Sequence, residues 1–68
     1  MSLASLYREH GRFMLRLARG YVRDGKHYSK DTPVQRRLRS EAARNALRKW
    51  RDGRWNLEHA ELMEKDDV

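Results

Sequence analysis

Residues 25–35 decide the fold, because they end one helical pattern and start another; they read Gly-Lys-His-Tyr-Ser-Lys-Asp-Thr-Pro-Val-Gln. Gly25 is typical of the position just past a helix C-terminus. The segment from Thr32 to Gln35 is a capping box with proline in the first helical position. The stretch therefore predicts a polar connection between two helices.

The first helix is expected to run from Leu3 to Asp24, with Ser2 as its N-cap. Two glycines lie inside it, and each costs about 1 kcal/mol relative to alanine. A close approach to another helix is the favoured explanation for Gly11. Small residues occur every seven positions along this helix, a spacing that keeps a contact on one face: Ala4, Gly11 and Ala18.

The second helix is expected to run from Pro33 to Asp52, with Gly53 as its stop. Asn56 is a candidate cap for a short third helix over residues 57–65. No strand pattern or repeat accompanies these helices. The fold class is therefore all-α, a hairpin of two long amphipathic helices with a possible short third helix.

The length and composition favour association between copies of the chain. A chain of 68 residues buries only about 60% of its unfolded surface, and this one has no cysteine for disulfides. Well-packed helices and oligomerisation are the remaining sources of stability. With no cysteine and no apolar run of signal or membrane-span length, a cytoplasmic location is expected.

Charge divides the chain into two expected parts, a basic hairpin domain over 1–57 and an acidic C-terminal helix or tail over 58–68. The first part has 15 basic and 5 acidic residues, and the second has one basic and five acidic residues, which together give the net charge of +6. A basic body is typical of proteins that bind polyanions or acidic protein surfaces.

The apolar face of the first helix is wider than the arc of about 100° that an ordinary surface helix buries. The seam of the second helix is narrow and rich in alanine, and it advances in steps of four: Val34, Leu38, Ala42, Ala46 and Trp50. One narrow seam cannot cover the wide face, so we expect a homodimer that forms a four-helix bundle. A folded-back third helix is the alternative. The expected core and dimer residues are Leu3, Leu6, His10, Phe13, Met14, Leu17, Tyr21, Leu38, Ala42, Ala46 and Trp50.

Arginines form a stripe on each helix. The plain interpretation is the solvated face of an amphipathic helix. Arginine outnumbers lysine 12 to 4, however, and the first stripe contains no acid to offset its self-repulsion, which favours a negatively charged partner. The expected partner-binding residues are Arg8, Arg12, Arg16, Arg19, Arg23, Arg37, Arg44, Arg48, Arg51 and Tyr28.

Catalytic and metal-binding patterns are absent from the sequence. The histidines at 10, 27 and 59 lack ligand spacing, and no glycine-rich phosphate loop follows a strand. We expect no enzyme activity, cofactor or metal. His10 is expected to be packed in the core or at an interface.

Binding to an acidic protein surface is the favoured function, because arginine and aromatic residues are enriched at protein interfaces. A small regulator of this type, which blocks a host factor or a transcription regulator, is typical of phages and mobile elements. Binding to RNA or DNA is the main alternative. Residues 36–51 resemble the arginine-rich helices of phage antitermination peptides, which also carry a tryptophan that can stack on an RNA base. Membrane-surface binding by a basic amphipathic helix is a third possibility.

Overall fold

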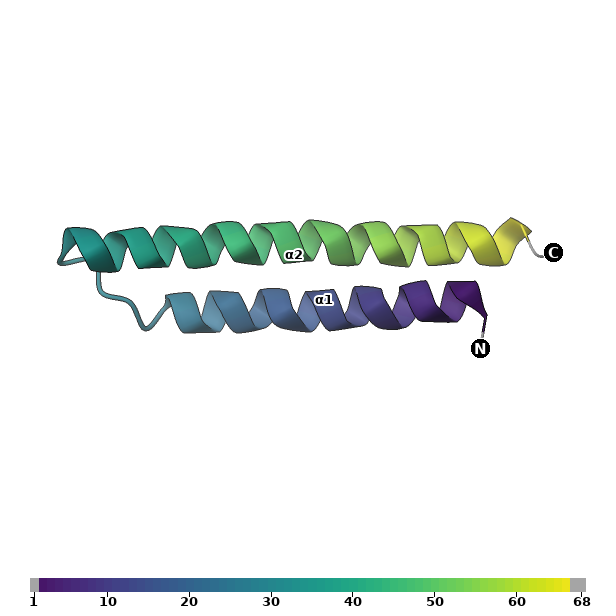
Figure 1. Ribbon diagram of the computed structural model, residues 1–68, viewed down its shortest axis with the longest axis horizontal. Coiled ribbons are helices and arrows are strands. Elements are labelled where there is room, and N and C mark those ends of the chain that lie inside the picture. Colours follow the sequence, from purple (N-terminus) through teal and green to yellow (C-terminus); the bar gives the residue numbers. More distant parts are fainter. Residues whose placement is uncertain (1, 67–68) are drawn as a thin grey trace.

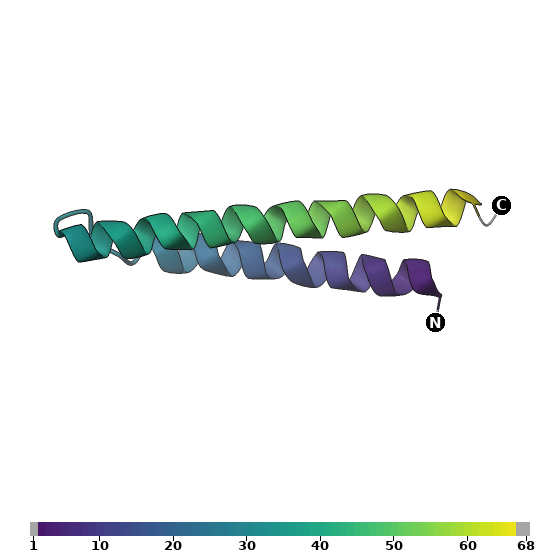
Figure 2. The same cartoon turned by 45° about the horizontal axis from the view of Figure 1, so that its top comes forward.

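Two antiparallel helices make up residues 2–66, the part of the chain that this computed structural model describes. They are α1 (Leu3–Gly25) and α2 (Pro33–Asp66), and a short connection joins them at one end of the molecule (Figure 1). The hairpin is elongated, with extents of 55 × 15 × 11 Å. A view turned by 45° shows the helices side by side along the length of α1 (Figure 2). The expected all-α hairpin is confirmed.

Side-chain caps start both helices at the expected residues. Ser2 Oγ accepts a hydrogen bond from the Ser5 N–H at 3.1 Å, and Thr32 Oγ1 accepts one from the Gln35 N–H at 3.2 Å. The return bond of the capping box is replaced, because Gln35 Oε1 accepts from the Ser29 N–H at 3.0 Å. The glutamine therefore ties the connection to the first turn of α2.

The expected stop at Gly53 is wrong, because α2 continues through it without interruption. Gly53 lies at a close approach of α2 to α1: a Cβ atom built there would lie 2.9 Å from the Gly11 carbonyl oxygen. Asn56 does not cap a new helix either. It is buried in the middle of α2, and its Nδ2 donates to the Asp52 carbonyl oxygen at 2.7 Å.

The folded-back third helix is therefore also excluded. Residues 58–66 are the last turns of α2 and continue its axis (Figure 1). The acidic segment expected over 58–68 is thus part of a long helix as far as Asp66, and positions 67–68 lie outside the described residues.

Small residues line the contact between the helices. The expected close approach along α1 is confirmed, because Ala4, Gly11 and Ala18 are all buried. A matching heptad on α2, formed by Ala46, Gly53 and Ala60, is buried as well. In a pair of antiparallel helices, a step of seven residues towards the C-terminus of one helix lies opposite a step of seven residues towards the N-terminus of the other. The contact between Gly11 and Gly53 thus sets the register of the whole seam.

Large hydrophobic residues lie outside this seam. The buried hydrophobic residues of the described part are five alanines, at positions 4, 18, 42, 46 and 60. Nine large hydrophobic residues have at least 47% of their surface exposed: Leu3, Leu6, Phe13, Val22, Val34, Leu47, Trp50, Trp55 and Leu62. The single hairpin therefore leaves most of its large apolar side chains available to another molecule.

Candidate functional site

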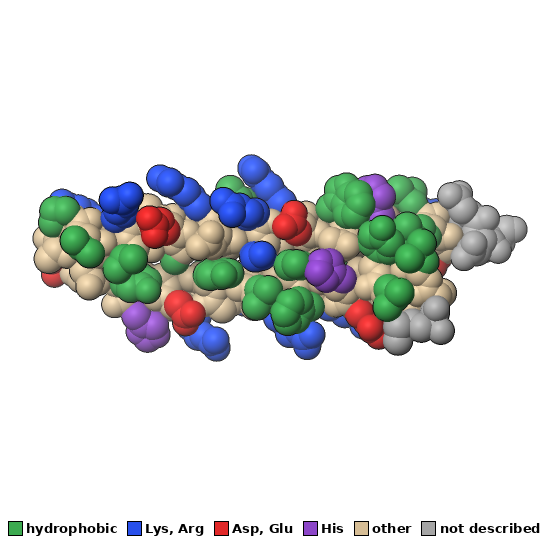
Figure 3. Space-filling view, viewed as in Figure 1, with side chains coloured by type: hydrophobic (Ala, Val, Ile, Leu, Met, Phe, Trp, Pro, Cys, Tyr) green, Lys and Arg blue, Asp and Glu red, His purple; other side chains and the backbone are tan. Residues whose placement is uncertain are grey.

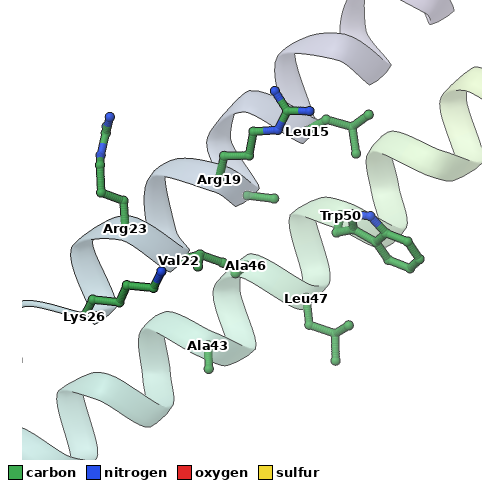
Figure 4. A pocket seen from close by; sticks show the side chains of 10 residues that line it. Leu15, Arg19, Val22, Arg23, Lys26, Ala43, Ala46, Leu47 and Trp50 are labelled. Atoms are coloured by element: carbon green, nitrogen blue, oxygen red, sulfur yellow. The ribbon is translucent and has the colours of Figure 1, made fainter.

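One open groove runs between α1 and α2, with a volume of about 620 Å³. Its walls come from the turns of α1 nearest the connection and from the facing part of α2 (Figure 4). The lining residues are Leu15, Ala18, Arg19, Val22, Arg23, Lys26, Ala43, Ala46, Leu47 and Trp50. We call this surface the basic groove.

The floor of the basic groove is apolar and its α1 edge is basic. Ala18 and Ala46 belong to the small-residue seam, and their short side chains leave the groove deep where the two backbones are close. Arg19 and Arg23 on α1, and Lys26 directly after it, line one side (Figure 4). None of the lining residues is acidic, so the groove presents apolar surface beside uncompensated positive charge.

Trp50 forms part of the α2 side of this groove. The structure leaves 48% of it exposed, beside the seam in which the sequence had placed it. The Arg54 guanidinium lies over its ring, with Cζ 5.6 Å from the ring centroid, in a cation–π arrangement. Arg54 also forms an ion pair with Glu58 at 3.4 Å. The indole is thus oriented by its neighbour and remains accessible to a partner.

The arginine stripe of α1 is exposed except at one end. Arg12, Arg16, Arg19 and Arg23 are exposed and form no ion pair with the described residues. Arg8 is partly buried and forms an ion pair with Glu64, near the C-terminal end of α2. The acidic end of α2 therefore compensates one member of the expected binding set.

The arginines of α2 lie beyond the basic groove. Arg44, Arg48 and Arg51 line a shallow hollow that shares Leu47 with it, so they stand on the far side of Leu47 from Arg19 and Arg23. Arg37 forms an ion pair with Glu41 at 3.5 Å and is largely exposed. The two stripes consequently do not merge; the groove separates them.

Tyr28 is half-buried in the connection. Its carbonyl oxygen accepts a hydrogen bond from Arg39 Nη1 at 3.2 Å, and the Lys30 carbonyl accepts one from Arg36 Nη1 at 3.3 Å. These two arginines hold the connection and were not singled out in the sequence. Leu15, Val22 and Leu47 of the groove were missed as site residues too. The first two are seven residues apart and follow the small-residue heptad by four, a spacing that signals the flank of the seam.

A second surface, the apolar face, lies on the side of α1 remote from the groove. At about 100° per residue, Leu6 and Phe13 point roughly 160–180° away from Leu15 and Val22. The residues of this face on α1 are Leu3, Leu6, His10 and Phe13, which are exposed, and Met14, Leu17 and Tyr21, which are half-buried. Of the other expected core residues, Leu38 is half-buried, while Ala42 and Ala46 are buried.

Trp55 extends the apolar face onto α2. Its ring centroid lies 6.1 Å from that of Tyr7, and His59 stacks on it with centroids 3.7 Å apart. Figure 3 shows hydrophobic side chains along both helices, gathered most densely towards the end that holds the termini, with basic side chains at the outer edges. The molecule therefore has two distinct surfaces that could bind other molecules.

Comparisons with protein-family models, curated proteins and solved structures found no match to this chain. Within residues 2–66, no group of three or more histidine or acidic side chains could hold a metal ion. Neither of the two described helices combines the length and apolar character needed to cross a membrane. The basic groove and the apolar face are thus the features of residues 2–66 that bear on function.

Proposed function

We propose that the protein is a small non-enzymatic regulator that binds a protein partner stoichiometrically and inhibits or modulates it in the cytoplasm. One observation carries this proposal: nine large hydrophobic side chains and most of the arginines are exposed, whereas the buried hydrophobic residues are all alanines, packed with Gly11 and Gly53. Exposed aromatic residues and arginines are the residues that anchor protein interfaces.

The basic groove favours a protein over a nucleic acid. A base of a nucleic acid could stack on Trp50, but a phosphate backbone offers no apolar side chain to cover the aliphatic floor formed by Val22 and Leu47, which gains free energy when apolar surface covers it. The acidic end of α2 also opposes phosphates. Glu64 already neutralises Arg8, and Glu58 and Glu61 are exposed nearby on the same helix.

Binding to RNA or DNA is the second candidate. Four exposed arginines without acidic partners among the described residues, at positions 12, 16, 19 and 23, favour it because each could neutralise a phosphate. The two functions predict different losses of affinity when arginines of the stripe are replaced, so a mutational scan can distinguish them.

The protein is also proposed to form a homodimer through the apolar face. Its accessible surface is 5551 Å², about 1,000 Å² more than the roughly 4,500 Å² typical of a folded monomer of 8.2 kDa. A stable interface buries about 800 Å² on each partner, so pairing of two hairpins accounts for the excess. The apolar face is the natural interface, because Leu3, Leu6 and Phe13 on it are large apolar side chains that the hairpin leaves about half exposed or more.

An alanine scan of the α1 stripe at two salt concentrations tests the proposed function. The partner is first captured from lysate with and without nuclease. A protein interface predicts uneven losses, with one or two arginines each contributing about 2 kcal/mol or more and the others almost nothing. Salt should slow association and leave the complex largely intact.

Nucleic-acid binding predicts the opposite pattern. Each Arg→Ala change should then reduce the slope of log K against log salt by about one, with similar losses along the stripe. Uniform and strongly salt-dependent losses would overturn the proposal in favour of nucleic acid. Unchanged affinity at all five positions would identify the stripe as a solvated face.

A further inference from the structure

We infer that the basic groove is a docking site for one acidic amphipathic helix of the partner protein. This inference depends on the proposed function, and it adds the location of the site and the chemistry of the segment that fills it.

The dimensions of the groove suit a short helix. Its α1 side extends from Leu15 to Lys26, which at 1.5 Å per residue is roughly 16 Å, or about three helical turns. A helix that lies in a groove uses apolar anchors at positions i, i+3 or i+4, and i+7. An extended strand is not favoured, because its backbone would require an exposed sheet edge and both groove walls are helical.

The floor supplies a continuous apolar strip for those anchors. Val22 is 50% exposed, Leu47 is 47% exposed and Trp50 is 48% exposed, while the alanines between them keep the strip low. Half-exposed side chains around small residues leave room for inserted leucine or phenylalanine side chains. Binding would therefore bury apolar surface that the isolated hairpin leaves in water.

The charges around the floor select an acidic ligand. Arg19, Arg23 and Lys26 line one side of the groove. The arginines at 44, 48 and 51 belong to a separate hollow beyond Leu47, which Asp52 also lines. An incoming helix with acidic residues on the flank towards α1 would therefore meet opposite charge at the groove edge. A helix with basic flanks would be repelled, and this repulsion gives the site its selectivity.

A second copy of this chain is a poorer occupant than an acidic partner. Residues 1–57 carry 15 basic and 5 acidic side chains, so most faces of a second hairpin would bring arginines against this basic edge. The acidic turns at the end of α2 already use Glu64 to pair with Arg8 and Glu58 to pair with Arg54. The groove and the apolar face therefore have different proposed occupants.

A defined peptide tests the inference with the full-length protein. The probe is a fluorescein-labelled, capped peptide of about 14 residues, with leucines every third or fourth position and glutamates along one flank of the leucines. Matched probes replace its glutamates with lysines, or are a single-stranded RNA oligonucleotide of equal charge. Binding is measured by fluorescence anisotropy at two salt concentrations.

Two double variants with the same change in charge distinguish the groove from general attraction. Arg19→Glu with Arg23→Glu reverses the groove edge, and Arg48→Glu with Arg51→Glu reverses the outer side of α2. All four positions are exposed and lie outside the seam, so circular dichroism should show unchanged helix content. Val22→Gln tests the floor without changing charge.

The inference predicts that the groove double variant weakens the acidic peptide by about tenfold or more, and that the outer double variant changes it by less than about threefold. Val22→Gln should weaken it at both salt concentrations. Equal losses in both double variants, or no binding of the wild type up to about 100 µM peptide, would overturn the inference. The proposed function would survive such a failure if the arginine scan against the captured protein partner still gave uneven losses.

RNA binding that exceeds peptide binding and falls equally in both double variants would overturn both the inference and the proposed function. Preference for the lysine-containing peptide would overturn the assignment of the groove to an acidic helix. It would leave the proposed function, binding to a protein partner, untouched.

Discussion

The two sides of α1 have opposite compositions. Ala4, Gly11 and Ala18 face α2 and are buried, whereas Leu6 and Phe13 on the other side are about half exposed. Small residues allow the backbones to approach closely, and of the large side chains Leu15 and Leu57 fit against the opposing glycines Gly53 and Gly11. The hairpin thus depends on close contact over its length, and the hydrophobic surface of its large residues remains for interactions with other molecules.

The largest expected effect comes from filling the seam. A Cβ atom at Gly53 would already lie 2.8 Å from Leu15 Cδ2 and 2.9 Å from the Gly11 carbonyl oxygen, so the branches of leucine would force α1 away. Gly53→Leu should reduce the free energy of unfolding by about 3 kcal/mol or more, measured by urea denaturation. Ser40→Leu, at an exposed position of α2, is the control and should change it by less than about 0.5 kcal/mol. Similar stability of both variants would mean that the helices do not approach closely at Gly53.

Two glycines of α1 give an internally matched pair with effects of opposite sign. A Cβ at Gly11 would lie 2.9 Å from both the Gly53 carbonyl oxygen and Leu57 Cγ, whereas one at Gly20 would meet nothing within 4 Å. Gly11→Ala should destabilise the hairpin by about 1–2 kcal/mol, because crowding exceeds the gain in helix propensity. Gly20→Ala should stabilise it by about 0.5–1 kcal/mol. Stabilisation by both changes, measured by the same denaturation, would remove the structural role of Gly11.

A smaller effect is expected at the cap of α2. Thr32→Ala removes the bond to the Gln35 N–H and should cost about 1 kcal/mol of stability. Partner affinity of the folded variant should be unchanged, because Thr32 is remote from the residues that line the basic groove. A loss of affinity in a variant that titration shows to be fully folded would place the connection within the binding surface.

The helix starts and the α1 seam could be predicted from the sequence because they depend on local chemistry. Serine or threonine before a helical pattern has a cap geometry of its own, and a spacing of seven keeps Ala4, Gly11 and Ala18 on one face whatever packs there. The expected hairpin followed from these signals together with the polar connection.

Gly53 could not be interpreted in the same way. A glycine after a long helical pattern usually marks an end, and only the opposing Gly11 explains why this one lies within a helix. The matching heptad of Ala46, Gly53 and Ala60 is present in the sequence, but a seam traced in steps of four from Val34 turns away from it. Each such step shifts the seam by about 40° around the helix.

The basic groove depends on how far each helix is rotated about its own axis, and the pattern of either helix alone does not contain that information. Leu15 and Val22 therefore appeared as parts of one wide apolar face. The structure divides that face into the groove, the seam and the apolar face, and Trp50 moves from the expected seam to the groove wall.

The exposed large residues are proposed to be interfaces, and sedimentation equilibrium tests this most directly. At about 10 µM protein, the mass should be about twice 8.2 kDa. Phe13→Asp on the apolar face should give the monomer mass, because it would bury an unpaired charge in the dimer. Leu47→Asp is the matched control: Phe13 and Leu47 are both 47% exposed, but Leu47 lies in the groove, so that variant should remain dimeric. A wild-type mass near 8.2 kDa, or dissociation by Leu47→Asp and not by Phe13→Asp, would contradict the assignment of the apolar face to the dimer.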